Sequence, residues 1–314
     1  MNRTNQFISI VIPVLDEEGS IKELYNEICN ALQNFSKWEI IFVDDGSKDN
    51  SVKIINELIT EDPNVQLIKF YRNFGKAAAL SEGFKYAKGE IIITMDADLQ
   101  DDPFEIQNLI NKINDDWDMV SGWKKKRNDP MSKTFPSKIF NYFTRLMTRV
   151  NIHDFNCGLK AYRSEVVKSI EIYGSLHRYI PALAKQKGFS VSEIEVNHRP
   201  RIHGETKYGG ARYAEGFFDL ITVLFVGKYT SRPLHFFGLI GMILILIGLG
   251  INVYLTIGWF KGVWIGNRPI FYLGILLLIV GVQFISIGLL GELMVKSSRQ
   301  SEKRIESVIT NSKK

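Results

Sequence analysis

Apolar residues in the N-terminal half of the chain gather in short runs that alternate with amphipathic segments. The runs are rich in β-branched residues, as buried strands are, and the segments between them have helical periodicity. The pattern predicts strands at 7–14, 38–43, 65–70, 90–95 and 118–121, and helices at 20–35, 51–60, 76–87 and 103–114. Alternation at this spacing is typical of an α/β fold whose mostly parallel sheet is covered by helices on both faces.

Two long apolar stretches near the C-terminus have a different character. Neither 233–260 nor 269–291 contains Asp, Glu, Lys or Arg, and each exceeds the about 20 residues that a helix needs to cross a bilayer. We therefore expect a catalytic domain at 1–210, a juxtamembrane amphipathic segment at 211–232, transmembrane helices at about 233–257 and 269–291, and a basic tail at 292–314.

Basic residues are distributed unequally around this expected hairpin. The connecting loop holds Lys261 and Arg268, whereas the outer flanks hold Lys228, Arg232, Lys296, Arg299, Lys303 and Arg304. Positive charge near membrane spans favours the cytoplasmic side. We therefore expect a multi-pass protein of the inner (cytoplasmic) membrane, with both termini and the catalytic domain in the cytoplasm.

Glycines recur in both apolar stretches, at 238, 241, 248 and 250 in the first and at 274, 281, 288 and 291 in the second. Small residues let membrane helices approach closely, so these stretches could also associate with a second copy of the chain. A further amphipathic stretch at 137–150 could lie in the membrane interface or face an ordinary protein core.

The net charge of the 314-residue chain is +5. Beside membrane spans, Lys and Arg are better explained by anionic lipid headgroups than by nucleic acid, so we expect no nucleic-acid partner. Cys29 and Cys157 are the only cysteines and form no Cys-x-x-Cys pair. Two thiols in a large domain indicate a reducing compartment without a disulfide framework.

Two aspartates, Asp96 and Asp98, directly follow the strand predicted at 90–95. Carboxylates one residue apart at a strand end can hold a hard divalent cation, which in turn neutralises a diphosphate. Gln100 could add a neutral oxygen ligand. A turn rich in aspartate would explain the same residues without any ligand.

A second aspartate pair, Asp44 and Asp45, ends the strand at 38–43 and is followed by Gly46 and Ser47. A tight turn and a helix N-cap explain Gly46 and Ser47, but they do not explain an aspartate pair at the end of an apolar strand. Either carboxylate could hydrogen-bond a base or a ribose.

Four motifs in this order resemble glycosyltransferase family 2, and within it the polyprenyl-phosphate glycosyltransferases that are similar to dolichol-phosphate mannose synthase, of the bacterial two-span type. The motifs are Val11-Ile12-Pro13 with Asp16-Glu17-Glu18, then 43–47 (VDDGS), 72–76 (RNFGK) and 95–103 (MDADLQDDP). The similarity runs from about Ser9 to Tyr208 and extends to the two apolar stretches.

The resemblance implies a GT-A fold, a nucleotide-diphosphate-sugar donor, and Mg²⁺ or Mn²⁺. Carried over by position, the metal ligands are Asp96, Asp98 and Gln100, and Asp44 contacts the uracil or ribose. The full set of implied donor-binding residues is Pro13, Glu17, Asp44, Asp45, Lys76 and Asp96.

The resemblance also suggests which residues meet the acceptor. The segment 154–160 resembles the part of the family that faces the acceptor, and 201–208 resembles a mobile loop that closes over the donor. Arg201 and Lys207 would contact phosphates there. The candidates for the acceptor phosphate are Lys124, Arg127 and Lys138, and those for catalysis are Asp96, Asp98, Asp154, Arg201 and Lys207.

Attack by a lipid phosphate is consistent with a site that has no Ser-His-Asp catalytic triad. A lipid monophosphate is largely dianionic at pH 7, so it can attack without losing a proton. The site then has to align it with the anomeric carbon and stabilise the departing diphosphate. Asp154 could orient the acceptor or act as a base, or it could support the turn at Asn156–Gly158.

The sequence thus predicts a metal-dependent enzyme that transfers one sugar, with inversion, from a nucleotide sugar to polyprenyl phosphate at the cytoplasmic membrane face. UDP and undecaprenyl phosphate are favoured by resemblance to bacterial members, and the product would serve cell-envelope glycan modification. A processive polysaccharide synthase is disfavoured because the chain lacks Gln-x-x-Arg-Trp and has few spans. An inactive membrane scaffold is disfavoured by the intact Asp96/Asp98 pair.

Overall fold

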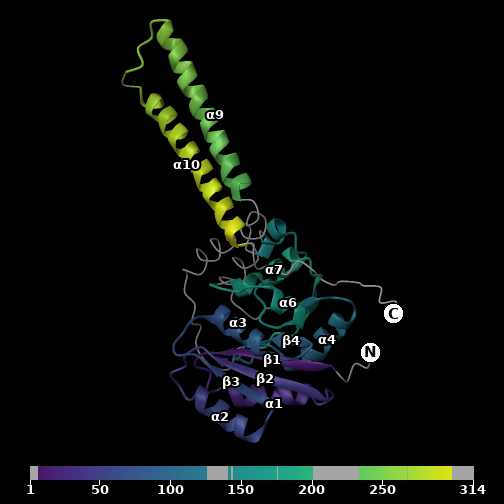
Figure 1. The fold of residues 1–314 in the computed structure, drawn as a ribbon. Helices are drawn as coiled ribbons and strands as arrows, with labels where there is room; N and C mark the ends of the chain where they lie inside the picture. The colour runs from purple at the N-terminus through teal and green to yellow at the C-terminus, as the bar shows by residue number, and fades with distance from the viewer. Residues whose placement is uncertain are drawn as a thin grey trace, which may run out of the picture. The chain divides into compact units, whose positions relative to one another are not determined.

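The computed structural model describes residues 6–125, 141–142, 144–174, 176–200, 233–266 and 268–298. The chain divides into two compact units, Met1–Val223 and Leu224–Lys314. Within the described residues, the first unit is an α/β domain with a seven-stranded sheet, and the second contains a pair of long helices (Figure 1).

The elements of the first unit follow the predicted alternation. Its strands are β1 (Phe7–Val14), β2 (Lys37–Asp44), β3 (Val65–Lys69), β4 (Ile91–Thr94), β5 (Met119–Trp123), β6 (Lys160–Arg163) and β7 (Val191–Glu195). Its helices are α1 (Ile21–Ala31), α2 (Ser51–Glu61), α3 (Lys76–Tyr86), α4 (Ile106–Asn114), α6 (Ser164–Ser169) and α7 (Ile180–Gln186), with short 3₁₀ turns η2 (Pro103–Glu105) and η3 (Leu176–Tyr179).

The sheet has the strand order β3-β2-β1-β4-β6-β5-β7. Among the described strands, β6 alone runs antiparallel to its neighbours β4 and β5, while the other pairs are parallel. The predicted mostly parallel α/β sheet is therefore confirmed. Because β6 points the other way, its first residue, Lys160, lies at the same edge as the carboxyl ends of the other strands.

Alternating side chains of β1 explain why the sheet is buried on both faces. Ile8, Ile10 and Ile12 belong to one core cluster with residues of α1 and α4, and all three are fully buried. Val11 points to the other face, where Gly83 of α3 lies so close that an added Cβ would be 2.3 Å from Val11 Cγ1. Parallel strands covered on both faces carry near-continuous apolar runs, which is the pattern seen here.

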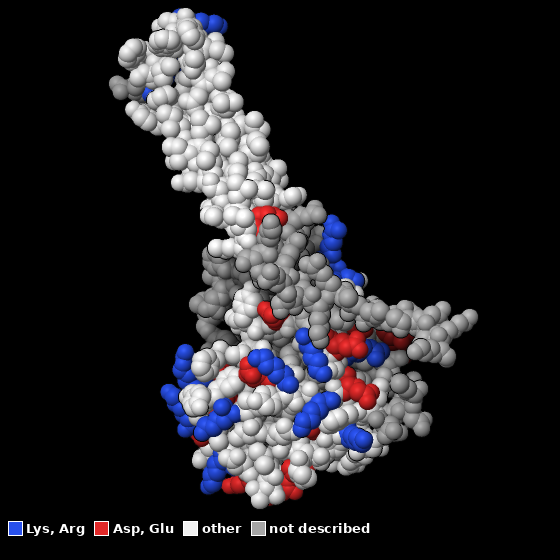
Figure 2. Space-filling model, in the orientation of Figure 1, with Lys and Arg blue, Asp and Glu red and all other residues white. Residues whose placement is uncertain are grey.

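The second unit contains α9 (Pro233–Phe260) and α10 (Pro269–Ser298). Residue pairs along the contact, from Gly248 with Gly274 to Gly241 with Gly281, show that the helices are antiparallel. Two segments, Pro233–Phe260 and Pro269–Met294, are long and apolar enough to cross a membrane. On the face of this pair visible in Figure 2, charged side chains lie only near the ends.

The amphipathic stretch at 137–150 is described in part. Residues 141–142 and 144–148 are helical. Leu146 and Met147 are exposed, whereas Asn141, Thr144 and Val150 are buried. The apolar residues expected to form one face are thus not all turned to the core, and Ile139, Phe140 and Phe143 lie outside the described residues. The membrane-interface interpretation stays a prediction, as does the juxtamembrane segment at 211–232.

Candidate active site

The polar clusters of the sequence meet where the strand order of the sheet reverses. From β1 the chain proceeds to β2 and β3 on one side, whereas β4 pairs with the other side of β1. Asp16 and Glu17 follow β1, and Asp96 and Asp98 follow β4. In doubly wound sheets the crevice at the carboxyl ends of such strands is the place where ligands bind.

Asp96 and Asp98 both follow β4 at this edge of the sheet, and their environments differ. Asp98 is 7% exposed, and its Oδ1 accepts a hydrogen bond from the Gln100 N–H at 3.2 Å. The side chain of Asp96 is 31% exposed and pairs with the Lys76 ammonium at the start of α3. Burial would raise the pKa of Asp96, but the charges of Lys76 and Lys124 lower it to about 2. Asp96 is therefore a carboxylate at neutral pH.

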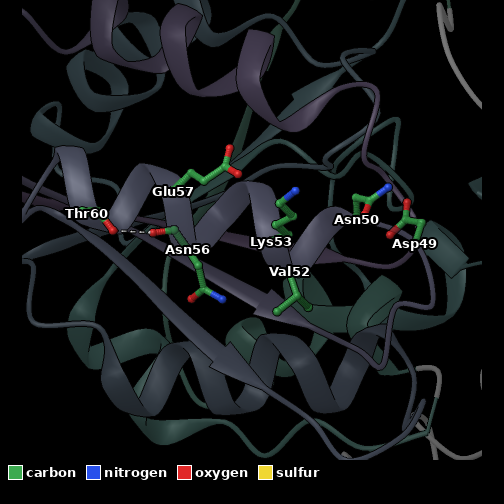
Figure 3. A pocket seen from close by; sticks show the side chains of 7 residues that line it. All are labelled: Asp49, Asn50, Val52, Lys53, Asn56, Glu57 and Thr60. Atoms are coloured by element: carbon green, nitrogen blue, oxygen red, sulfur yellow. Dashed lines mark hydrogen bonds between the residues drawn. The ribbon is translucent and has the colours of Figure 1, made fainter.

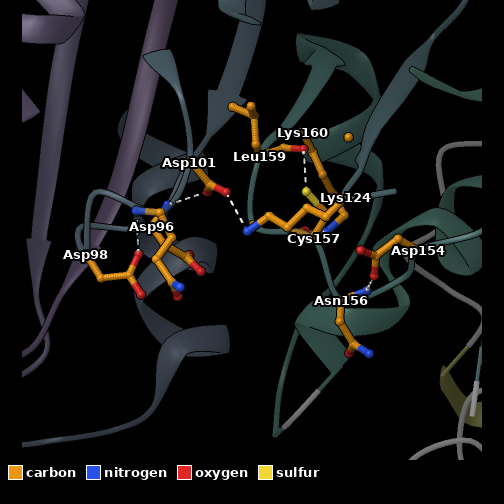
Figure 4. A network of polar contacts seen from close by, with 12 residues as sticks. Asp96, Asp98, Asp101, Lys124, Asp154, Asn156, Cys157, Leu159 and Lys160 are labelled. Carbon is orange, nitrogen blue, oxygen red and sulfur yellow. Dashed lines mark hydrogen bonds and ion pairs between the residues drawn. The ribbon is translucent and has the colours of Figure 1, made fainter. Parts of the chain in front are cut away.

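Asp101 connects the aspartate loop to the end of β5 (Figure 4). Its Oδ2 accepts the backbone N–H of Asp96 at 3.1 Å, and its Oδ1 lies 2.8 Å from Lys124 Nζ. Asp101 is 1% exposed. Burial would lower the pKa of Lys124, but the Asp101 charge raises it above its usual range. The predicted acceptor-phosphate lysine is thus charged and held beside Asp96 by a carboxylate whose role the sequence did not indicate.

Lys160 is a third lysine near Asp96, and the strand register explains its position. It is paired with Thr94 on β4 and with Ser121 on β5, so it enters the site between the ends of these two strands. Its side chain is buried and donates a hydrogen bond to the Cys157 carbonyl. Burial, the largest cause, lowers the pKa of Lys160. The sequence placed Lys160 in the acceptor-facing segment but gave it no role of its own.

The segment before Lys160 forms a turn at the site. Asp154 is 1% exposed, and its Oδ1 accepts the N–H of Asn156 at 3.0 Å. The Thr94 hydroxyl donates to the Gly158 carbonyl at 2.8 Å, which fixes the turn to the end of β4. Asp154 therefore supports this turn, as one of the two sequence interpretations held. Its part in catalysis stays a prediction.

Asp44 and Asp45 have different partners at the end of β2. Asp44 is fully buried; its Oδ1 accepts the Ser47 N–H at 3.2 Å, and its Oδ2 has no hydrogen-bond partner in the described part of the chain. Asp45 accepts the N–H groups of Phe74 and Gly75 at 2.7 and 2.9 Å. Asp44 thus offers a free acceptor atom, whereas the Asp45 carboxylate holds the loop that leads to Lys76.

Pro13 and Glu17 lie at the same edge of the sheet. Pro13 is partly exposed near the end of β1, where it pairs with Val43. The Glu17 N–H donates to Ser51 Oγ at 2.9 Å, and its carboxylate accepts the Ser20 hydroxyl at 3.2 Å. The structure places both residues at this edge of the sheet, and their contacts with a nucleotide stay predictions.

Four predicted phosphate-binding residues, Arg127, Lys138, Arg201 and Lys207, lie outside the described residues. The chain that leads to the last two is anchored at the site. The Arg199 N–H donates to the Gln100 carbonyl at 3.0 Å. Its guanidinium pairs with Glu27 at 2.7 Å and with Asp102 at 2.8 Å. Residue 201 therefore follows directly after a segment fixed beside the aspartate loop.

The sequence profile of one family, described as Glycosyl transferase family 2, matches residues 9–171. This span includes both aspartate pairs and the turn at 154–158. The chain belongs to glycosyl transferase family 2. The resemblance seen in the sequence is thereby confirmed, and so is the expectation that the chain is a transferase.

Two curated proteins match nearly the full chain. A dodecaprenyl-phosphate galacturonate synthase of Rhizobium johnstonii is 35% identical over 297 residues, which cover 92% of this chain and 88% of that protein. An undecaprenyl-phosphate 4-deoxy-4-formamido-L-arabinose transferase of Shewanella sediminis is 37% identical over 298 residues, covering 93% and 88%.

The fold of this family 2 chain also matches a solved structure. Glucosyl-3-phosphoglycerate synthase from Mycobacterium tuberculosis, in complex with Mn²⁺ and UDP-glucose, superimposes with a TM-score of 0.54 at 16% identity. The match covers 71% of this chain and 79% of that chain. Similarity at this level concerns the fold alone, and it agrees with the predicted GT-A domain.

The donor set at the family 2 site fits a divalent cation. Within the described ranges no three His, Cys, Asp or Glu side chains form a preformed cage. Mg²⁺ at nucleotide sites, however, is usually held by one or two carboxylates together with substrate phosphates. Asp96 and Asp98, with the amide oxygen of Gln100, offer the hard oxygen ligands that such an ion requires.

A separate hollow of about 520 Å³ lies along α2 and contains none of these residues. It is lined by Asp49, Asn50, Val52, Lys53, Asn56, Glu57 and Thr60 (Figure 3). The Thr60 hydroxyl is directed back to its own helix, where it donates to the Asn56 carbonyl at 3.0 Å. The charged residues of this hollow are Asp49, Lys53 and Glu57, and it holds none of the aspartates and lysines that gather around Asp96, so we assign the chemistry to the edge of the sheet at Asp96.

Proposed function

We propose that this chain transfers a single sugar from a nucleotide-diphosphate sugar, a UDP-sugar by preference, to undecaprenyl or a related polyprenyl phosphate. One observation carries the proposal. Asp96, one of the carboxylate pair at the strand-order reversal, lies near three lysines: Lys76 at the start of α3, Lys124 directly after β5 and Lys160 at the start of β6. Carboxylates suit a metal, and clustered cations suit the phosphates of donor and acceptor.

Each group has a distinct part in this proposal. Asp96, Asp98 and Gln100 hold Mg²⁺ or Mn²⁺, which when bound neutralises the donor diphosphate. Lys76 and Lys160 add positive charge where the diphosphate leaves. The Oδ2 atom of Asp44, which has no hydrogen-bond partner among the described residues, accepts a hydroxyl or an N–H of the nucleoside.

The acceptor phosphate would lie on the other side of the aspartate loop. Lys124 is the described candidate for it, since Asp101 holds the Lys124 ammonium close to Asp96. Attack by a phosphate dianion needs no general base, so Asp154 can keep its place in the turn. A single displacement from the face opposite the diphosphate inverts the anomeric carbon.

Two further findings support a membrane acceptor. The matching curated proteins are named for transfer to dodecaprenyl or undecaprenyl phosphate, and the described residues include two helices long and apolar enough to cross a bilayer. With the basic flanks on the cytoplasmic side, both termini and the active site would lie in the cytoplasm. The product, a polyprenyl-phosphate sugar, would serve cell-envelope glycan modification.

The test is transfer from radiolabelled UDP- and GDP-sugars to undecaprenyl phosphate, with Mn²⁺, Mg²⁺ or EDTA. Asp96→Asn should lower transfer by at least about 100-fold, since loss of even an outer-shell partner of a metal costs about 10- to 100-fold. Asp116→Asn is the matched control. Asp116 is exposed, with a φ of 65° that asparagine tolerates.

Label that enters the lipid with one donor, and is lost with EDTA, would establish the reaction and name the sugar. No transfer from any donor, with no metal-dependent UDP binding by calorimetry, would contradict the proposal and favour the scaffold.

A further inference from the structure

The aspartate loop, residues 96–102, contains a strained residue. Leu99, between Asp98 and Gln100, has a φ of 61°, in the left-handed region that favours glycine. Its side chain is 1% exposed and packs in the hydrophobic core. A non-glycine residue keeps such a conformation only where the surrounding contacts enforce it, and residues of this kind gather at functional sites. The contacts around Leu99 should therefore show what holds the loop in place.

A second segment, 197–199, runs beside the aspartate loop. Each of its three residues contacts one residue of the loop, in antiparallel order: Asn197 with Asp102, His198 with Asp101 and Arg199 with Gln100. The Arg199 N–H donates to the Gln100 carbonyl at 3.0 Å. The backbone is thus fixed at the residue that directly follows the strained Leu99.

The side chain of Arg199 links the same loop to α1. Its Nη2 donates to Asp102 Oδ1 at 2.8 Å, and its Nη1 donates to the Glu27 carboxylate at 2.7 Å. Glu27 lies on α1 between Leu24 and Ile28, which are both fully buried, so the helix is a fixed support. A planar guanidinium presents donors in several directions in its plane and can hold two carboxylates at once. Arg199 therefore ties the aspartate loop to a helix that the core keeps in place.

We propose that Arg199 is a positioning residue for the divalent cation. It holds the strained turn at Leu99 that separates two of the predicted metal ligands, Asp98 and Gln100, and it acts through the Gln100 backbone and through Asp102. A loop that is already ordered needs no ordering when the ion binds, so its ligands bind the ion more tightly. The inference rests on the proposed function, which takes Asp96, Asp98 and Gln100 as the ligands.

The experiment measures binding of Mn²⁺ in the presence of UDP by calorimetry, with the full-length chain in detergent. Arg199→Met keeps the length of the side chain and removes the guanidinium. It should weaken Mn²⁺ binding about tenfold, since loss of a residue that orients metal ligands costs about 10- to 100-fold in affinity. The Mn²⁺ concentration for half-maximal transfer should rise by a similar factor. The value of kcat at saturating Mn²⁺ should stay close to the parent value, because the bound ion restores the loop.

Arg163→Met is the matched control. The Arg163 guanidinium also bonds its surroundings, donating to the Ile113 carbonyl at 3.0 Å and lying 3.7 Å from Asp118 Oδ1, but it stands at the opposite end of β6 from Lys160. It should lower the melting temperature and leave Mn²⁺ binding unchanged. A merely structural role of Arg199 would give the same result as this control.

A second variant keeps the test valid if Arg199→Met does not fold. Arg199→Lys retains the positive charge but loses the fork that holds two carboxylates, so it should fold and weaken Mn²⁺ binding by a smaller factor. Hydrogen exchange of the loop without metal gives an independent readout. The amide of Asp96, bonded to Asp101 Oδ2, should exchange faster in either variant than in the parent, and Mn²⁺ with UDP should restore its protection.

The outcomes separate this inference from the proposed function. If the parent binds no UDP in a Mn²⁺-dependent manner, the proposed function falls and the inference falls with it. If the parent does bind, but both Arg199 variants bind Mn²⁺ as tightly as Arg163→Met, the positioning role is overturned and the proposed transferase is unaffected. A fall in kcat at saturating Mn²⁺ with unchanged Mn²⁺ affinity would equally overturn it.

Discussion

Gly158 lies directly against the carboxylate of Asp96. A Cβ added at position 158 would be 2.6 Å from Asp96 Cγ and 2.7 Å from each carboxylate oxygen. The same glycine is held from the other side, because the Thr94 hydroxyl donates to its carbonyl. The turn at 154–158 therefore forms one wall of the site and sets the position of a proposed metal ligand.

Gly158→Ala should lower the transfer activity while leaving the stability of the fold nearly unchanged. The atoms that the new methyl group meets are the end of a partly exposed side chain, so Asp96 moves while the fold stays. We expect a loss of transfer of about 100-fold, since a misplacement near 1 Å can cost that much. The melting temperature should change little, and calorimetry should show weaker binding of Mn²⁺ with UDP.

The matched substitution is Gly250→Ala, because nothing lies within 4 Å of the atom added there. Gly250→Ala should leave transfer at the parental rate. A Gly158→Ala protein with full activity would mean that the Asp96 carboxylate is not a ligand in the reaction.

Asp101→Asn should destabilise the first unit. It leaves the Lys124 ammonium, which is 12% exposed, without its carboxylate. Removal of one partner from a buried ion pair costs about 3–5 kcal/mol. Thermal unfolding of the full chain should show the loss, and the double variant Asp101→Asn/Lys124→Met should recover a large part of it. If the double variant is no more stable than the single one, the pair does not provide this energy.

The sequence predicted the strand ends well because a parallel sheet makes them conspicuous. An apolar run followed at once by aspartates, as at Asp44 or Asp96, marks both the end of a buried strand and the edge where ligands bind. The predicted strands β1 to β5 match the structure to within about two residues. The helix expected at 20–35 is shorter and ends at Ala31.

Lys160 and Asp101 could not be assigned in the same way. The place of Lys160 depends on β6 entering the sheet antiparallel between β4 and β5, which no local pattern reveals. The role of Asp101 depends on Lys124, which comes from the end of another strand. For the glycines, the sequence indicated close packing but could not show that most of them face the partner helix of the same chain.

Because of the His177 side chain, the stability of the folded protein should decline as the pH drops below 6.5. Burial, followed by the charges of Lys76 and Arg178, lowers its pKa well below the ordinary value, and its Nδ1 has no partner in the described structure. The unfolded imidazole takes up a proton below about pH 6.5 while the folded one does not. The stabilisation is thus complete above pH 6.5 and declines by up to about 1.4 kcal/mol per pH unit below it, until the folded pKa is reached.

The measurement is the melting temperature of the full chain between pH 7.5 and 5. His177→Gln keeps a neutral polar side chain and should remove part of the decline on acidification. Identical pH profiles for the two proteins would show that His177 is accessible to protons in the folded state.

Gly281→Ala should destabilise the pair of long helices. Alanine in place of glycine ordinarily favours a helix by about 0.5–1 kcal/mol. At position 281, however, the added methyl would be 2.6 Å from Ile245 Cγ1 and 2.8 Å from the Gly241 carbonyl oxygen. Backbone cannot move aside cheaply, and overpacking of this kind costs about 1–3 kcal/mol, so the clash outweighs the gain in helix propensity.

Gly250→Ala again supplies the control, since it gains the helix propensity without a clash. Thermal unfolding in detergent should place Gly281→Ala below the parent protein and Gly250→Ala at or above it. The reverse order would mean that α9 and α10 do not pack along this glycine seam.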